Sequence, residues 1–343
     1  MRKYLLPKDG KFYKANLHCH TTYSDGKLTP AQIKQAYMER GYSIVAYTDH
    51  CLLVPHHKEL TDENFVALNG CELDSPEPGI DRMHRKTCHM CFIALDPENV
   101  TTPFYHSEKY VFGNMTEYRD KVKRDESVPD YERDHTSECI CDMMSKGREM
   151  GFFITYNHPT WSLENYSDYI NFHGMHAMEM YNYLSRVGGH EDINPRVYDD
   201  ILRGGERIYC IGADDNHNGR AFDHRRCDSF GAWTMIRAEK LEYTAVTDAL
   251  LKGHFYASTG PEIKELYLEN GEIHIQTSPC ESIIMHTNCR RSVSVHREKG
   301  RSLTKASFPV YEDCTYVRFT VFDKKNERAD TNAYWTDELL SDK

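Results

Sequence analysis

Seven short apolar segments, each followed by a polar or helix-forming stretch, constrain the fold of this chain more than any other feature. These predicted strands lie at 14–18, 43–48, 65–72, 89–95, 152–157, 176–181 and 207–213. Helical patterns lie among them at 30–40, 136–150, 193–203 and 240–252. The first helix shows the clearest start, because Thr29 can cap it and Pro30 suits its first position. Alternation of this kind predicts an α/β protein built on a parallel sheet or barrel.

Two regions depart from this alternation. Residues 97–135 are polar with little strand pattern, and we expect a surface insertion that covers the functional site. Beyond about residue 260, Asn270-Gly271 predicts a tight hairpin and 314–323 alternates with period two. The sequence therefore predicts a main domain over 1–261 and a small all-β domain over 262–343.

Composition excludes several classes of protein. The 343 residues carry a formal net charge of −11, which argues against binding to a nucleic-acid backbone. The sequence contains no run of about 20 apolar residues that would predict a membrane span. Its first residues also lack the apolar core of a signal peptide. We expect a cytoplasmic protein whose twelve cysteines are free thiols; the sequence does not fix its oligomeric state.

Histidine and carboxylate residues recur where the predicted strands begin or end. His18 and His20 stand two apart, so in extended backbone their imidazoles project to the same face. The other candidates are Asp25, His50, Glu72, His89, His158, Asp215 and His217. In α/β proteins such positions gather at one edge of the sheet, which predicts a site for several metal ions. Mixed imidazole and carboxylate donors suit Zn, Mn or Fe, and we expect two or three such divalent ions.

The order of these motifs resembles a known family. HxH followed by SDG, then TDH, a single Glu, a single His, NHP and DxH is similar to the PHP (polymerase and histidinol phosphatase) family. The resemblance covers about residues 14–260 and implies a distorted (β/α)7 barrel. The sequence FYASTGPEI and the β-rich tail further resemble a two-domain branch that includes carbamate-hydrolysing enzymes.

The resemblance also implies how the ligands divide among three metal ions. The first ion would be held by His18, His20, Glu72 and Asp215, which are also the expected catalytic residues. The second would share Glu72 and add His89 and His158. The third would be held by Asp25, His50 and His217, although some relatives place a histidine where this chain has Gly26. The neighbouring Asp214 is a further candidate, but the DxH spacing favours Asp215.

The function implied is hydrolysis of a small phosphate ester by a hydroxide that bridges two metal ions. Two alternatives stay open: a carbamate or carboxylic ester hydrolase with the same metal site, and a non-catalytic PHP scaffold. Arg220, Arg225 and Arg226 follow the last ligand and are candidates for binding an anionic small-molecule substrate, with a solvated loop as the alternative. Trp161 and Tyr181 are candidates for lining the pocket, but we expect them to pack in the core instead.

Overall fold

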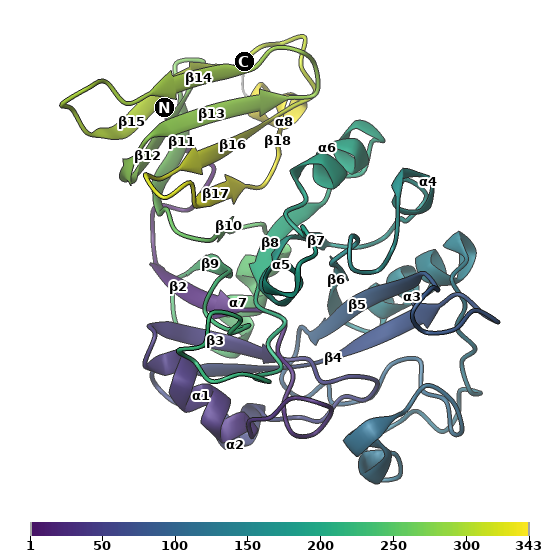
Figure 1. The fold of residues 1–343 in the computed structure, drawn as a ribbon. Coiled ribbons are helices and arrows are strands. Elements are labelled where there is room, and N and C mark those ends of the chain that lie inside the picture. The colour runs from purple at the N-terminus through teal and green to yellow at the C-terminus, as the bar shows by residue number, and fades with distance from the viewer. Residues whose placement is uncertain (1, 342–343) are drawn as a thin grey trace.

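The computed structural model describes residues 2–341 and has the mixed α/β character expected from the sequence. Of the seven predicted strands, all are present with ends shifted by a few residues at most, and 152–157 is reproduced without change. They are β2 (Lys11–Asn16), β3 (Tyr42–Tyr47), β4 (Val66–Pro76), β5 (Thr87–Ala94), β6 (Phe152–Asn157), β7 (Ala177–Asn182) and β8 (Tyr209–Ala213). Figure 1 shows these strands together below the C-terminal strands.

Helices lie between many of the strands, and the first two of them connect parallel neighbours. The predicted helices correspond to α1 (Pro30–Met38), α3 (Ser137–Glu149), α6 (Pro195–Arg203) and α7 (Tyr243–Leu251). Shorter helices are α2 (His57–Leu60), α4 (Tyr166–Tyr169), α5 (Tyr183–Gly188) and the 3₁₀ helix η1 (Gly113–Tyr118). Thr29 caps α1 as expected, and it forms a reciprocal capping box with Gln32. None of the helices in residues 2–341 has the length and apolarity needed to cross a bilayer.

The strand pairings form an open path rather than the expected distorted (β/α)7 barrel. The largest sheet has the order β14-β13-β16-β17-β10-β9-β2-β3-β4-β5-β6-β7-β8, with β18 paired to β16. β2, β3 and β4 pair in parallel, but β5 is antiparallel to both β4 and β6. Antiparallel neighbours need only a hairpin, so no helix separates β4 from β5 and the alternation is broken there.

Beyond the strand ends, the chain nevertheless brings β8 close to β2. The main-chain N–H of Asp215 donates to the carbonyl of His18 at 3.0 Å, and that of His20 donates to Asn216 at 3.0 Å. Thr234 on β9 (Trp233–Ala238) accepts a hydrogen bond from the N–H of Gly212 at 3.1 Å. The chain segments that follow β2 and β8 therefore meet at the edge where the site lies, although no strand ladder joins these two strands.

The C-terminal region is rich in strands but is joined to the main sheet. Its elements are β10 (Phe255–Ser258), β11 (Ile263–Glu269), β12 (Glu272–Cys280), β13 (Ser282–Thr287), β14 (Val293–His296), β15 (Leu303–Pro309), β16 (Tyr316–Phe322), β17 (Arg328–Thr331), β18 (Tyr334–Trp335) and α8 (Thr336–Leu339). β11 and β12 form the predicted hairpin, with positive φ at Asn270 and Gly271. β10 pairs with β9 on one side and with β17 on the other.

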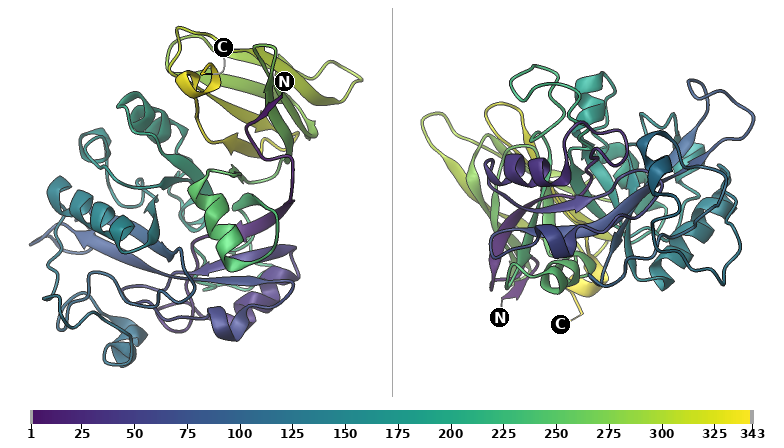
Figure 2. Two further views of the ribbon diagram at one scale, coloured as in Figure 1. Left: turned by 180° about the vertical axis from the view of Figure 1, so that it is seen from behind. Right: turned by 90° about the horizontal axis from the view of Figure 1, so that it is seen from below.

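The chain's first strand also belongs to this C-terminal layer. β1 (Lys3–Tyr4) pairs with β11 in a four-stranded sheet of order β1-β11-β12-β15. Figures 1 and 2 show both chain ends beside these strands. Apolar residues of both layers, including Ile263, Ile283 and Phe319, form a common buried cluster. The C-terminal region is therefore joined to the rest of the chain by strand pairing as well as by its buried cluster.

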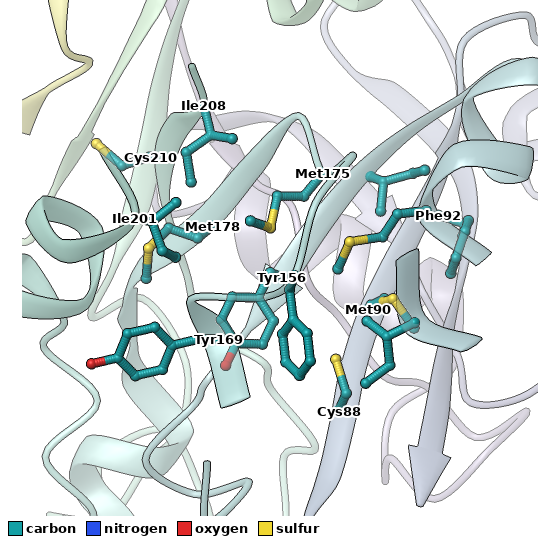
Figure 3. Packing of buried hydrophobic residues seen from close by; sticks show 14 of the residues in the cluster. Cys88, Met90, Phe92, Tyr156, Tyr169, Met175, Met178, Ile201, Ile208 and Cys210 are labelled. Carbon is teal, nitrogen blue, oxygen red and sulfur yellow. The ribbon is translucent and has the colours of Figure 1, made fainter. Parts of the chain in front are cut away.

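The largest buried cluster lies behind strands β5 to β8. Figure 3 shows Met90 and Phe92 of β5, Tyr156 of β6 and Met178 of β7 packed together with Ile201 of α6. All five are buried. This packing fixes the strands whose ends carry the candidate site.

Candidate metal centre

Strand ends bring all nine predicted ligands to one edge of the main sheet. The ligands come from the loop after β2 (His18, His20, Asp25), the end of β3 (His50), β4 (Glu72), β5 (His89), the end of β6 (His158) and the loop after β8 (Asp215, His217). His89 lies near the beginning of β5 and Glu72 lies within β4, whereas the other ligands follow the ends of their strands. Because β5 is antiparallel, its beginning lies at the same edge as the ends of β4 and β6, and His89 pairs in register with Asp74 and Asn157.

The Glu72 carboxylate lies at the middle of the cluster and is 1% exposed. Five imidazoles surround it. The contacts of Oε1 are His89 Nδ1 at 3.0 Å, His18 Nε2 at 3.2 Å and His158 Nε2 at 3.3 Å, and those of Oε2 are His50 Nδ1 at 3.1 Å and His20 Nε2 at 3.4 Å. Both oxygens are thus shared among several imidazoles, which is the arrangement expected of a carboxylate that bridges two cations.

Asp215 contributes a second carboxylate, and Asp214 does not. Oδ1 of Asp215 lies 3.1 Å from His20 Nε2 and 3.3 Å from His18 Nε2. The carboxylate of Asp214 instead accepts hydrogen bonds from the Tyr37 hydroxyl and from main-chain N–H groups of residues 230–232. The backbone of Asp215 has a φ of 54°, a left-handed conformation that is uncommon outside glycine. Strain of this kind is concentrated at functional sites, where it fixes the direction of a side chain.

Asp25 collects the remaining imidazoles. Its Oδ1 lies 3.2 Å from His217 Nε2, 3.7 Å from His50 Nε2 and 4.0 Å from His20 Nδ1. The next residue, Gly26, has no space for a side chain, because a Cβ there would lie 2.6 Å from the carbonyl oxygen of His20. In this conformation a histidine cannot occupy position 26, and Asp25 is the donor that faces this group.

The donor atoms fit cations rather than hydrogen bonds alone. Oδ1 of Asp25 and Oδ1 of Asp215 are buried and accept no hydrogen bond of acceptable geometry, although imidazole nitrogens are close to both. A divalent cation would satisfy such atoms and would accept the imidazole lone pairs as well. Four groups of donors have atoms within 4.8 Å of one another: His20, Asp25, His50 and His217; His18, His158 and Asp215; Glu72, His89 and His158; and His18, Glu72 and Cys91.

The grouping resembles the predicted ligand sets with differences. Glu72, His89 and His158 form one group as expected, and Asp25, His50 and His217 are joined by His20. His18 and Asp215 group with His158 instead of with His20 and Glu72, although Glu72 and His20 are also within contact distance. The nine residues therefore form one continuous cluster.

The charges of the cluster perturb its titration strongly. Burial would raise the pKa of Glu72, but the imidazoles of His18 and His89 hold that pKa well below its usual value. Burial would lower the pKa of His158, but Glu72 and Asp215 raise it to about 9. Likewise the Asp25 carboxylate raises the pKa of His217 to about 9 against the effect of burial. Protons and metal ions would compete for these imidazoles, so metal binding would release protons here.

A second layer of polar residues was missed by the sequence analysis. Glu179 on β7 is fully buried, and its Oε1 lies 2.7 Å from Nδ1 of His18. Asn182 donates to both Glu179 at 2.9 Å and Asp215 at 3.1 Å. The available signal was Glu179 itself, a single charged residue inside an otherwise apolar strand, since such residues are seldom buried without a partner.

A cavity of about 850 Å³ opens onto the metal centre. Tyr110, Val111 and Phe112 of the 97–135 segment line it, together with Trp161 from the loop after β6. The side chain of Trp161 is 39% exposed, so the expectation that it packs in the core is wrong, whereas Tyr181 is buried in the core as expected. The 97–135 segment thus contributes directly to the walls of the site.

The three predicted anion-binding arginines lie elsewhere. Arg220, Arg225 and Arg226 are exposed, and none of them lines the cavity. Asp228 explains their position, because it accepts hydrogen bonds from the main-chain N–H groups of His217 and Asn218 and so closes the intervening residues into an external loop. The structure therefore favours the solvated loop. Two other arginines, Arg82 and Arg85, line the cavity instead.

The chain is similar to proteins of known structure. The chain is similar to a two-domain protein from Bacteroides vulgatus that contains a predicted PHP-like metal-dependent phosphoesterase, with 14% identity, 97% of each chain covered and a TM-score of 0.46. It is also similar to a proposed metal-dependent phosphoesterase from Bifidobacterium adolescentis, with 15% identity, 62% of this chain and 89% of that chain covered, and a TM-score of 0.37. No family model matches the sequence. The search of curated proteins likewise gave no match.

Proposed function

We propose that this chain is a metal-dependent phosphoesterase of the PHP type that hydrolyses a small, anionic phosphate ester. One observation carries the proposal: five imidazoles surround the two oxygens of the buried Glu72 carboxylate, while two further carboxylate oxygens, from Asp25 and Asp215, lack hydrogen-bond donors. The order of the sequence motifs supports the same proposal.

The residues of the cluster would hold two or three divalent ions, for which we propose Zn, Mn or Fe. When bound, these ions would lower the pKa of water and stabilise the negative charge that develops on a phosphoryl group. Glu72 and Asp215 would keep the ligand groups together, because both carboxylates contact more than one imidazole. Glu179 would hold His18 in the tautomer that leaves Nε2 free.

The walls of the cavity supply the remaining requirements. Phe112 and Trp161 would limit the access of bulk water to a bound ester, which strengthens electrostatic interactions inside the site. The walls also include Asp25 and His50, so an ester in the cavity would be in direct reach of the ligand cluster.

The test measures metal content and hydrolysis together. Protein purified without chelators is analysed by plasma emission and then assayed with Zn, Mn or Fe on p-nitrophenyl phosphate, bis-p-nitrophenyl phosphate and p-nitrophenyl acetate. We expect metal-dependent release of p-nitrophenol from a phosphate substrate. Cleavage of the acetate without cleavage of either phosphate would point instead to a carbonyl hydrolase, and no turnover on a broad panel would point to a scaffold.

Variants locate the activity in the cluster. His20→Ala and Glu72→Ala should both lose metal and activity while far-UV circular dichroism stays unchanged. His296→Ala removes an exposed histidine of β14 and serves as the matched control. Full activity in either cluster variant would refute the assignment of the site.

A further inference from the structure

The hairpin that carries two ligands of the metal centre also carries two arginines. β4 contains Glu72 and β5 contains His89, and residues 77–86 connect these strands. Arg82 and Arg85, in this connection, both line the cavity. Arg85 lies four residues from His89, so their Cα atoms are at most about 14 Å apart. A molecule of modest size can therefore reach the metal centre and Arg85 together.

Two other charged groups of the same connection have ionic partners, whereas the two arginines have none in the part of the chain that the structure describes. Asp81 contacts His84 at 2.8 Å, and Lys86 contacts Asp168 at 2.8 Å. Within residues 2–341, neither Arg82 nor Arg85 forms an ion pair with a carboxylate, and Nε of Arg85 is buried without a hydrogen-bond partner. A buried donor without a partner destabilises the protein, and a bound anion would satisfy it. Guanidinium groups suit this role because they bind carboxylate and phosphate through paired hydrogen bonds.

Apolar side chains with unusually high exposure surround the same cavity. Met83 is 79% exposed, Leu163 46%, and Phe112 and Trp161 39% each, and all four line the cavity. Exposed apolar groups that gather at a concave site mark a surface that binds an apolar or aromatic ligand. The walls therefore offer contacts to an apolar body between the metal centre and the arginines.

We propose that the substrate is a phosphate monoester whose leaving group has an aromatic or apolar body and bears a second anionic group, which Arg82 and Arg85 bind. This inference rests on the proposed function, because it places the scissile phosphate at the metal centre. Hydrolysis breaks the P–O bond with one water molecule and gives inorganic phosphate and the alcohol that bears the anion. No further reactant is required.

The test uses substrates that differ only in the distal charge. 3-(4-Phosphonooxyphenyl)propanoate is compared with its methyl ester, which has the same leaving oxygen and nearly the same size. A third substrate carries a distal phosphonate and distinguishes recognition of a carboxylate from recognition of a phosphate-like group. We expect kcat/KM to be about tenfold or more higher for at least one of the anionic substrates than for the ester.

Arginine variants identify the source of this preference. In Arg82→Ala and Arg85→Ala the ratio of kcat/KM between the anionic substrate and the ester should fall about fivefold or more, mainly through KM. Arg290→Ala, an exposed arginine in the turn before β14, should keep the wild-type ratio. A wild-type ratio near one, or a wild-type ratio retained in both cavity variants, overturns the inference.

Binding measurements separate this inference from the proposed function. Non-hydrolysable difluoromethylphosphonate analogues of the acid and the ester are titrated into metal-loaded protein by calorimetry. If no phosphate ester is turned over but the acid analogue binds more tightly than the ester in wild type and not in Arg85→Ala, the proposed activity fails and the anion site stands. Equal Kd values for the two analogues in wild type reject the anion site whether or not there is turnover.

Discussion

Nδ1 of His18 lies 2.7 Å from Oε1 of Glu179, and both side chains are fully buried. The carboxylate therefore keeps the proton of this imidazole on Nδ1 and leaves Nε2 to face Glu72 and Asp215. Asn182 donates to Glu179 and fixes the carboxylate in turn. The direction of His18 Nε2 is thus set by Glu179 and Asn182, which lie outside the nine predicted ligands.

Replacing Glu179 by glutamine should weaken metal binding without leaving a cavity in the core, because the two side chains have nearly the same size. An amide can present its NH₂ group to His18 and stabilise the wrong tautomer, so we expect metal affinity to fall about 10- to 100-fold. Competition with a fluorescent chelator measures this change. Glu206→Gln alters a similar contact to His173 on the surface, at 2.9 Å, and should leave metal affinity unchanged. Equal affinities for Glu179→Gln and wild type would contradict the tautomer argument.

Gly26→Ala tests whether the loop after β2 tolerates any side chain beside Asp25. A Cβ at this position would lie 2.6–2.7 Å from the main chain of His20 and Thr21. The backbone would have to move, and we expect a loss of about 1–3 kcal/mol in the free energy of unfolding together with weaker binding of one metal ion. Urea unfolding and metal titration report the two effects. Gly219→Ala is the control, because nothing lies within 4 Å of a Cβ there.

His176 should make stability depend on pH outside the metal centre. Burial lowers its pKa to about 4, with a smaller contribution from Arg148, and its Nδ1 accepts a hydrogen bond from the N–H of Ile154 at 3.1 Å. In the unfolded chain the imidazole takes up a proton near its ordinary pKa of 6.5, whereas the folded protein resists protonation until about 4. The stability contributed by neutral His176 is therefore present above about pH 6.5 and is lost as the pH falls through this window, on the order of 3 kcal/mol in total.

The measurement compares wild type with His176→Gln, which keeps an acceptor but does not titrate. Urea unfolding of both proteins is followed from about pH 7 to pH 4 in the presence of a chelator, so that metal loss is common to both. The wild-type protein should lose more stability over this range than the variant. Parallel pH profiles for the two proteins would show that His176 does not contribute, and His296→Gln provides the exposed control.

Arg318 should be among the most sensitive positions in the C-terminal strands. It is 1% exposed on β16, and it contacts Asp199 of α6 at 2.8 Å and Asp330 of β17 at 3.0 Å. Arg318→Ala would remove the close partner of Asp199 and leave Asp330 with Arg328 alone, so this variant should cost about 3–5 kcal/mol in urea unfolding. Arg301→Ala breaks only an exposed contact to Glu298 and should cost less than about 1 kcal/mol. Similar losses in both variants would contradict the importance of burial.

The sequence predicts strands well here because each is a buried apolar run bounded by polar residues. Residues 152–157 and the hairpin at Asn270-Gly271 follow from local pattern alone. The direction of β5 does not, since an apolar run looks the same in either orientation, and this strand breaks the expected barrel. Local pattern also cannot tell which loop lines the site, so the sequence analysis named the arginines after His217, whereas Arg82 and Arg85 line the cavity.

The candidate site divides in the same way. Ligand types at strand ends can be identified from the sequence, because their chemistry and spacing repeat along the chain. Glu179 was missed because its partner His18 lies 161 positions earlier, a separation that only the folded sheet removes. The roles proposed for the nine ligands remain predictions that metal analysis will test.

The pairing of β10 with both β9 and β17 has a consequence for the history of this architecture. A chain cut after residue 261 would lack β17 and leave β10 with a row of unpaired main-chain donors and acceptors. Such an exposed edge strand promotes association with the strands of other molecules. Loss of the tail would therefore expose one edge of β10 unless other residues came to cover it. The two parts of this protein are therefore expected to be inherited together.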